Sequence, residues 1–161
     1  MIRGIHHVAV HTGQFDRMIA FYRDLIGFSE VSRTNWQNNE LIDSIIGLKG
    51  SAARQVMIRA GTCYLEIFEY LHPESRDSAP LRPCDRGYTH LCLDVTEIQK
   101  EYDRLTAAGM SFYRRPGDFG DLKAVYGHDP DGNIIEIQET TTDHEFSLRR
   151  LTPLYPRGNG I

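Results

Sequence analysis

The chain has 161 residues, of which 40% are hydrophobic and 25% are charged, and its formal net charge is −4. These proportions suit one soluble globular domain, and the slight acidity without any Lys- or Arg-rich run argues against nucleic acid as a partner. Apolar runs of only a few residues and an N-terminus without a signal-like segment argue against a membrane protein.

Two segments of similar pattern begin the two halves of the chain. GIHHVAV at 4–10 and GYTHLCLDV at 87–95 alternate apolar residues as a β-strand does, and superposing them aligns His7 with His90, 83 residues later. Alternation in a strand sends His6 and His7 to opposite faces, so only one of them faces a concave interior. The repeat selects His7.

Each of these strands precedes a stretch with helical spacing of apolar residues, over about 14–25 and about 97–108. The first half then carries an extra loop somewhere in 32–50, where NWQNNE and two glycines break the pattern. A loop of this length in a compact domain is often functional.

Each half closes on a strand with a glutamate in its middle. LEIFE at 65–69 and IEIQE at 135–139 place Glu66 and Glu136 at matching positions, 70 residues apart. The flanking Leu and Ile side chains are expected to enter the core, so the two carboxylates face the other surface of the sheet. A mid-strand carboxylate is costly to bury unless it is paired or bound to a cation.

Two imidazoles and two carboxylates at equivalent strand positions predict a divalent metal site. A lone strand histidine or glutamate more often has no such role, but four residues placed by one repeat favour ligands. Two nitrogen and two oxygen ligands suit Zn, Ni, Co, Mn or Fe(II), and ligand type does not choose among them. The predicted metal ligands are His7, Glu66, His90 and Glu136.

The remaining segments complete the predicted organisation. HDPDGN at 128–133 is typical of a turn that joins two strands as a hairpin. We expect one domain over 1–139, with halves of about 1–80 and 86–139, followed by a polar tail at 140–161 that forms a surface arm or contacts a partner.

The three cysteines are odd in number and have no CxxC spacing. Cys63, Cys84 and Cys92 are therefore predicted to be reduced core or near-core thiols of a cytoplasmic protein.

The residues between about 4 and 139 resemble the vicinal oxygen chelate superfamily. The similar segments are IHHVAV, FDRMIAFYRDLIGF, YLEIFE, GYTHLCLDV and DPDGNIIEI. This superfamily includes glyoxalase I, methylmalonyl-CoA epimerase, extradiol dioxygenases, fosfomycin-resistance enzymes and metal-free bleomycin-binding proteins. The resemblance implies an α+β fold of two βαβββ modules that form a curved, mostly antiparallel sheet around the metal, often within a homodimer.

The ligand set is most similar to that of glyoxalase I. This similarity implies a lyase or isomerase that acts on a small carbonyl or acyl substrate, in which the metal stabilises negative charge on oxygen. Glu66 or Glu136 would then be the base that transfers the proton.

A methylmalonyl-CoA epimerase is a related alternative, because EYLHPESRDSAPL at 69–81 is similar to the segment after the second metal ligand in that family. The resemblance breaks at 44–65, which contains no Asp or Glu where such epimerases place a further carboxylate. A two-base reaction would need another partner, such as Glu40 or Asp43 brought in by the loop.

An Fe(II)-dependent extradiol dioxygenase is the second alternative. Such enzymes use two histidines and one glutamate, here His7, His90 and Glu136, and a tyrosine in the strand before the last ligand, here Tyr126. Glu66 would then be an unexplained fourth carboxylate. A metal-free ligand-binding protein ranks last, because such relatives lack the ligand set.

Substrate recognition is not determined by these patterns, and each candidate lining residue also fits an ordinary strand or loop position. The candidates are Trp36, Arg54, Arg59, Tyr64 and Phe119.

Overall fold

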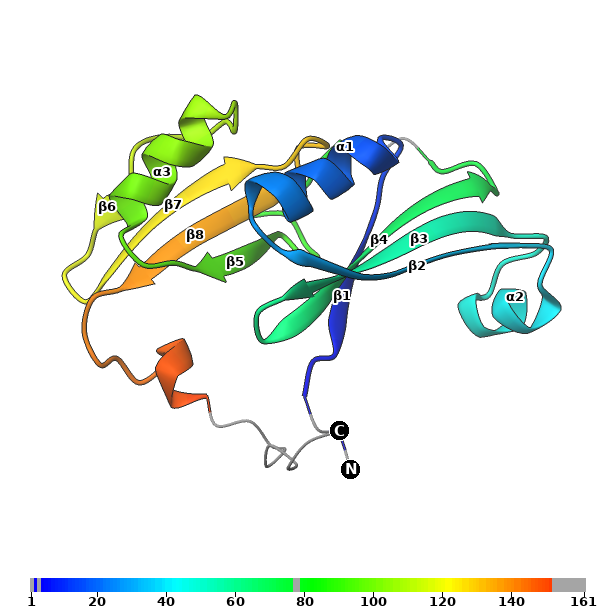
Figure 1. Cartoon of the computed structure of the whole chain (residues 1–161), viewed down its shortest axis with the longest axis horizontal. Helices are drawn as coiled ribbons and strands as arrows, with labels where there is room; N and C mark the ends of the chain where they lie inside the picture. The colour runs from blue at the N-terminus through cyan, green and yellow to red at the C-terminus, as the bar shows by residue number, and fades with distance from the viewer. Residues whose placement is uncertain (1, 3, 77–78, 152–161) are drawn as a thin grey trace. The chain divides into compact units, whose positions relative to one another are not determined.

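The computed structural model describes residue 2 and residues 4–76 and 79–151 (Figure 1). The chain divides into two compact units. The N-terminal unit comprises Ile5–Leu81 and the turn Asp129–Asn133, and the C-terminal unit comprises Arg82–His128 and Ile134–Ile161 together with Met1–Gly4.

The N-terminal unit contains a four-stranded sheet in the order β1-β4-β3-β2, with β1 parallel to β4 and the other pairs antiparallel. The helix predicted over 14–25 is confirmed, although its second half winds with the wider π-helical turn. The elements are β1 (His7–His11), α1 (Phe15–Ile19), η1 (Ala20–Leu25), β2 (Ser29–Gln37), α2 (Glu40–Ile46), β3 (Ala52–Ala60) and β4 (Cys63–His72).

The C-terminal unit repeats this arrangement with a sheet in the order β5-β8-β7-β6, in which β5 is parallel to β8. Two modules of mixed four-stranded sheets with few helices confirm the predicted α+β fold. The elements are β5 (His90–Asp94), α3 (Ile98–Ala107), β6 (Gly117–Asp118), β7 (Leu122–His128), β8 (Ile134–Thr140) and η2 (Leu148–Arg150).

In each unit, a helix covers one face of the sheet. The opposite face, here called the open face, carries the polar side chains that alternate with the buried ones along the strands. Helix α1 packs on β4, and α3 packs on β8. Leu65 and Ile67 flank Glu66 and are buried, as are Ile135 and Ile137 beside Glu136. Because each buried aliphatic side chain contributes about 1.5–3 kcal/mol, a one-residue slip of either strand would expose this core.

A buried hydrogen bond anchors the helix of the N-terminal unit. Tyr22 on η1 donates its hydroxyl proton to Asp129 Oδ2 at 3.0 Å. Asp129 also accepts from the backbone of Asp131 and Asn133 and from the Asn133 amide, so the turn that joins β7 to β8 is held around this carboxylate. Burial, followed by the charge and hydrogen bond of Asp129, raises the pKa of Tyr22 well above 10.0.

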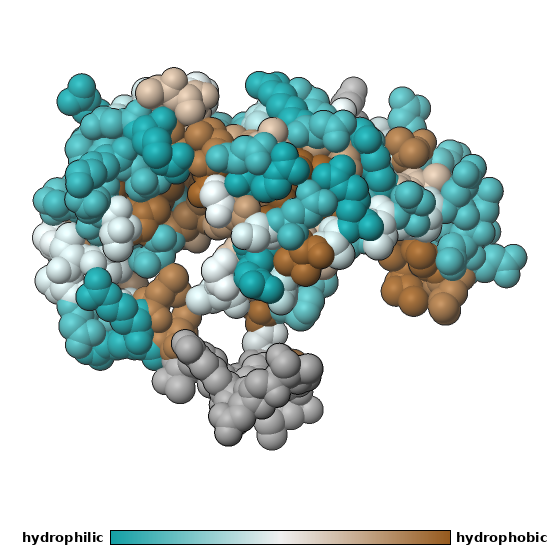
Figure 2. Space-filling view, in the orientation of Figure 1, coloured by the Kyte–Doolittle hydropathy of each residue, from teal (hydrophilic) through white to brown (hydrophobic). Residues whose placement is uncertain are grey.

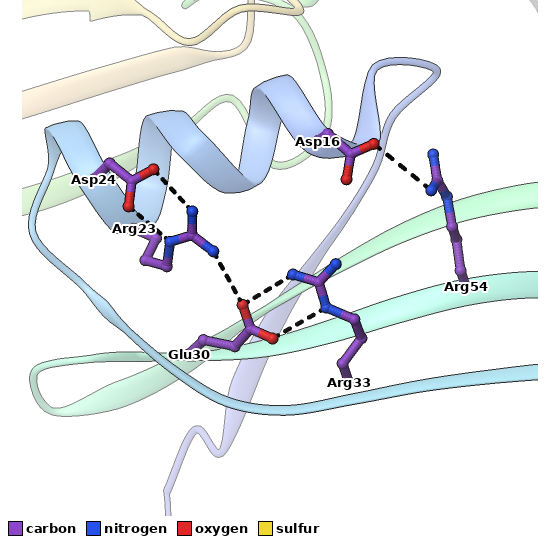
Figure 3. A network of polar contacts seen from close by, with 6 residues as sticks. All are labelled: Asp16, Arg23, Asp24, Glu30, Arg33 and Arg54. Carbon is purple, nitrogen blue, oxygen red and sulfur yellow. Dashed lines mark hydrogen bonds and ion pairs between the residues drawn. The ribbon is translucent and has the colours of Figure 1, made fainter.

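Ion pairs cover the outer edge of this helix (Figure 3). Arg33 on β2 pairs with Glu30, which also accepts from Arg23 on η1, and Arg54 on β3 pairs with Asp16 on α1. The Arg54 guanidinium lies 4.5 Å from the ring centre of Phe15 and also pairs with Glu69. Arg54 therefore belongs to the helix-covered face and does not line a site on the open face.

The loop predicted within 32–50 is only partly a loop. Strand β2 continues to Gln37, and α2 follows, with Asn39 as a cap that accepts from the Ile42 amide at 3.1 Å. The polar run NWQNNE, predicted to lie in a loop, contains the end of β2 and the N-cap of α2. Helix α2 buries none of its residues, and Leu41 and Ile45 contribute to an exposed apolar patch over it (Figure 2).

The prediction that the three cysteines lie in or near the core is wrong for two of them. All three are free thiols, but Cys84 and Cys92 are exposed and only Cys63 is half-buried. Cys92 follows the alternation of β5 onto the open face, because it lies two residues after His90.

Two expectations concern the ends of the chain and the membrane. Residues 152–161 of the predicted tail lie outside the described residues, whereas 148–150 form the short helix η2. Among the helices of the described residues, none is long and apolar enough to cross a membrane.

Candidate metal-binding site

The first candidate pair lies on the open face of the N-terminal unit. His7 is the first residue of β1, and Glu66 lies in the middle of the parallel neighbour β4, opposite Ala9. The His7 Nε2 atom is 3.3 Å from Glu66 Oε2. Desolvation raises the pKa of Glu66, and the two nearby histidines oppose that shift.

The second pair has the same construction in the C-terminal unit. His90 begins β5, Glu136 lies in the middle of the parallel strand β8, and Cys92 is opposite it in the register. The His90 Nε2 atom is 3.3 Å from Glu136 Oε2. The side chains of Glu66 and Glu136 are only 13% and 14% exposed, so both carboxylates are largely removed from water.

The distance of 3.3 Å within each pair is informative. A charge-assisted hydrogen bond between imidazolium and carboxylate is typically 2.7–2.9 Å long. Two ligands at about 2.1 Å from one ion, subtending 90° to 109°, lie about 3.0–3.4 Å apart. The donor atoms of each pair therefore have the spacing of adjacent ligands on a common ion.

The second nitrogen of each histidine is also engaged. His90 Nδ1 lies 3.0 Å from Thr89 Oγ1, and His7 Nδ1 lies 2.9 Å from His6 Nδ1. A proton on Nδ1 leaves the Nε2 lone pair directed at the glutamate, which is the usual arrangement of metal-binding histidines. Strand β1 begins only at His7, so the predicted alternation does not separate the two rings, and His6 contacts His7 edge-on.

Gln55 on β3 is a site residue that the sequence patterns did not identify. Its amide donates to Glu66 Oε1, and its own oxygen accepts from Thr34 Oγ1 at 2.8 Å. The hydroxyl therefore fixes the orientation of the amide, and the amide occupies the Glu66 oxygen that does not face His7. No motif marks Gln55, because its role depends on the register between β3 and β4.

Tyr126 and Cys92 are the corresponding neighbours of Glu136. Tyr126 is opposite Glu136 in the antiparallel register, and its ring centre lies 5.0 Å from that of His90. Desolvation, then Glu136 and Cys92, raises the pKa of Tyr126. Desolvation and the adjacent Glu136 raise the pKa of the Cys92 thiol to about 12.

The candidate lining residues have different surroundings. Trp36 donates to Ser51 Oγ at 2.8 Å and packs edge-on against Phe68 and Tyr70, next to Glu66 on the same face. Tyr64 stacks near His6, and Arg59 is exposed at the end of β3. Phe119 lines a cavity of about 700 Å³ in the C-terminal unit, which Glu136 and Tyr126 also line.

The structure brings the predicted ligands together in pairs. In the part of the chain that the structure describes, no group of three or more His, Cys, Asp or Glu side chains is placed to hold a metal ion. The four-ligand set and the catalytic roles of Glu66, Glu136 and Tyr126 stay predictions.

In each module the first strand is parallel to the last one, β1 to β4 and β5 to β8. Two such modules in one chain define the vicinal oxygen chelate class of fold. The chain belongs to the Glyoxalase/Bleomycin resistance protein/Dioxygenase superfamily, whose profile matches residues 4–137.

Relatives of similar length support this assignment. A probable lactoylglutathione lyase of Synechocystis is 24% identical over 138 residues, covering 84% of this chain and 95% of the relative. The uncharacterized protein YaeR of Escherichia coli is 28% identical, covering 86% and 97%. The crystal structure of a glyoxalase family protein of Bacillus cereus has the same fold, with a TM-score of 0.77, 21% identity and coverage of 87% and 95%.

Proposed function

We propose that the protein is a divalent-metal-dependent lyase or isomerase that moves a proton on a small carbonyl or acyl substrate. The observation that supports it is the repeated spacing of Nε2 and Oε2, 3.3 Å in both His7–Glu66 and His90–Glu136. Together the two pairs offer two nitrogens and two oxygens, which suits Zn, Ni, Co, Mn or Fe(II). A homodimer is part of the proposal, because small symmetric domains often associate through equivalent patches.

When bound, the ion would act as a Lewis acid toward a substrate oxygen. Glu136 is the better candidate for the base, because it lines the cavity in which a substrate would lie, whereas Glu66 is held by the Gln55 amide. A carboxylate that ligates a metal is a weak base, so Glu136 accepts a proton only when it is free to turn toward the substrate carbon. Its neighbour Tyr126 can donate a hydrogen bond to a substrate oxygen.

The name of the Synechocystis relative offers a first probe substrate, lactoylglutathione. Its carbon beside the carbonyl carries a proton that a base in this site would exchange with solvent. Exchange of that proton for deuterium measures the proton transfer alone, without a requirement for complete turnover.

The decisive experiment is elemental analysis of the protein purified without added metal, together with His7→Ala and His90→Ala. About one ion per chain is expected, with loss in both variants. His11→Ala and His128→Ala are matched controls, one from the sheet of each unit. Neither histidine has a carboxylate partner among the described residues. Absence of metal even after reconstitution, or full retention in the His7 and His90 variants, overturns the proposal.

A ring-cleaving dioxygenase is the alternative that one observation favours. Tyr126 lies beside both His90 and Glu136, where extradiol enzymes place a tyrosine. Iron in the elemental analysis, with oxygen consumption in the presence of a catechol, would favour this chemistry. Nickel, zinc, cobalt or manganese would favour the lyase or isomerase.

A further inference from the structure

The cavity of the C-terminal unit opens on the same face as Glu136. Its floor consists of alternate residues of two paired strands, because Ala124 is opposite Gln138 and Tyr126 is opposite Glu136. A volume of about 700 Å³ lies within the range of cavities that hold small organic molecules. Mostly apolar walls with a few polar groups are typical of such sites.

Aromatic rings form the rim of this cavity. Phe119 and Tyr113 are 73% and 58% exposed although both are large apolar side chains. The Phe119 ring lies 3.6 Å from the position that a Cβ atom would take on Gly117, an ordinary van der Waals distance, so the ring lies against β6 at this glycine. Exposed rings around an apolar hollow favour a flat, unsaturated ligand body, which can stack on them.

A cation stands at the rim as well. Arg114 lines the cavity, and its Nε donates to the Arg115 carbonyl oxygen at 3.2 Å. Among the described residues, no acidic side chain forms an ion pair with Arg114. Its terminal nitrogens are therefore available for a carboxylate, which a guanidinium binds with two parallel hydrogen bonds.

We propose that this cavity binds the aromatic ring of a small carboxylate-bearing substrate, with the carboxylate on Arg114 and the reacting end at Glu136. The two negative groups, the ligand carboxylate and Glu136, then lie at opposite ends of the ring. This inference rests on the proposed function for the position of the reacting end, and it adds the substrate class.

The test is isothermal titration calorimetry with trans-cinnamate, an aromatic carboxylate, and with cinnamamide, its neutral counterpart. Cinnamate is expected to bind more tightly than cinnamamide, both to the protein as purified and after metal removal with EDTA. Cinnamate binding that disappears with EDTA would show coordination to a metal instead, and would overturn the role of Arg114.

Two variants separate the charge from the ring contacts. Arg114→Gln is expected to raise the Kd of cinnamate about tenfold and to leave that of cinnamamide unchanged. Phe119→Ala is expected to raise the Kd of both probes about fivefold. Arg115→Gln is the matched control, because this neighbouring arginine does not line the cavity, and it should bind both probes as the unchanged protein does.

The outcomes separate this inference from the proposed function. Metal content is expected to be unchanged in Arg114→Gln and Phe119→Ala, because neither residue belongs to a histidine–glutamate pair. A protein that retains metal but does not bind cinnamate, or binds it equally in Arg114→Gln, overturns the substrate class alone. A protein that binds cinnamate through Arg114 but never holds metal overturns the proposed function alone.

Discussion

In the N-terminal unit the carboxylate of Glu66 is held by an amide, Gln55, whereas in the C-terminal unit Glu136 has a phenol and a thiol beside it. The positions of Tyr126 and Cys92 are occupied in the N-terminal unit by Met57 and Ala9, which neither donate nor accept strongly. Both units nevertheless keep the same 3.3 Å between imidazole and carboxylate. The duplicated pair thus has one restrained and one responsive environment, which suits a division between holding an ion and moving a proton.

The largest expected effect tests that division directly. Glu136→Gln should lower deuterium exchange into lactoylglutathione by about 10²–10⁴-fold, because an amide cannot accept the proton, while elemental analysis still finds metal. Glu66→Gln should mainly weaken metal binding. Equal exchange rates in Glu136→Gln and the unchanged protein would contradict the assignment of the base.

Cys92 reports on the environment of Glu136. With a pKa raised from 9.0 to about 12, its thiol should react with iodoacetamide about 30-fold more slowly than an ordinary thiol at pH 8, since the lower thiolate fraction outweighs the greater nucleophilicity. The measurement is peptide mass spectrometry on EDTA-treated protein, with glutathione as the reference. Glu136→Gln should accelerate labelling of Cys92. A rate equal to that of glutathione would contradict the raised pKa of Cys92, which desolvation and the adjacent Glu136 produce.

Gln55 tests the restrained half. Gln55→Leu removes the amide from Glu66 Oε1 and should weaken metal affinity about tenfold, as loss of an outer partner of a ligand usually does. Competition with a chelator gives the affinity. Gln138→Leu, on the open face of the other sheet, is the control and should have little effect. The melting temperature of the metal-free protein measures its folding stability. If Gln55→Leu destabilises the metal-free protein enough to account for the lost metal affinity, Gln55 has a structural role only.

The smallest effect concerns stability. Tyr22→Phe should lower the free energy of unfolding in urea by about 1 kcal/mol, because Asp129 loses one of several donors. The raised pKa of Tyr22 contributes stability below the unfolded-state value near 10, and that contribution is lost at higher pH. The difference between the two proteins should therefore shrink above pH 10. Tyr88→Phe, at a fully exposed position, should change neither quantity.

The repeat in the sequence was sufficient to predict the two modules and the core-facing neighbours of Glu66 and Glu136, because period-2 alternation fixes which side chains share a face. The exposure of Cys92 was also contained in that alternation, since it follows His90 by two residues. Alternation failed for His6, because it lies before the strand begins.

Other features depend on interactions that no local pattern encodes. Gln55 meets Glu66 through the register of two strands, and the cavity beside Glu136 arises where residues 113–119 return to β7. Helix α2 is short and exposed, and the sequence at its start is as polar as that of a loop. The capping residue Asn39 is therefore the sequence signal that indicates this helix.

The hydrogen bond between Tyr22 and Asp129 spans 107 residues of chain. During synthesis at about 5–20 residues per second, the tyrosine is added to the chain about 5–20 s before its partner. The N-terminal sheet can pair its strands in that interval. The hydroxyl of Tyr22 on the helix has no Asp129 to donate to until the turn has been synthesised. The last turn of the polypeptide to be translated within this unit is thus the one that completes the first module.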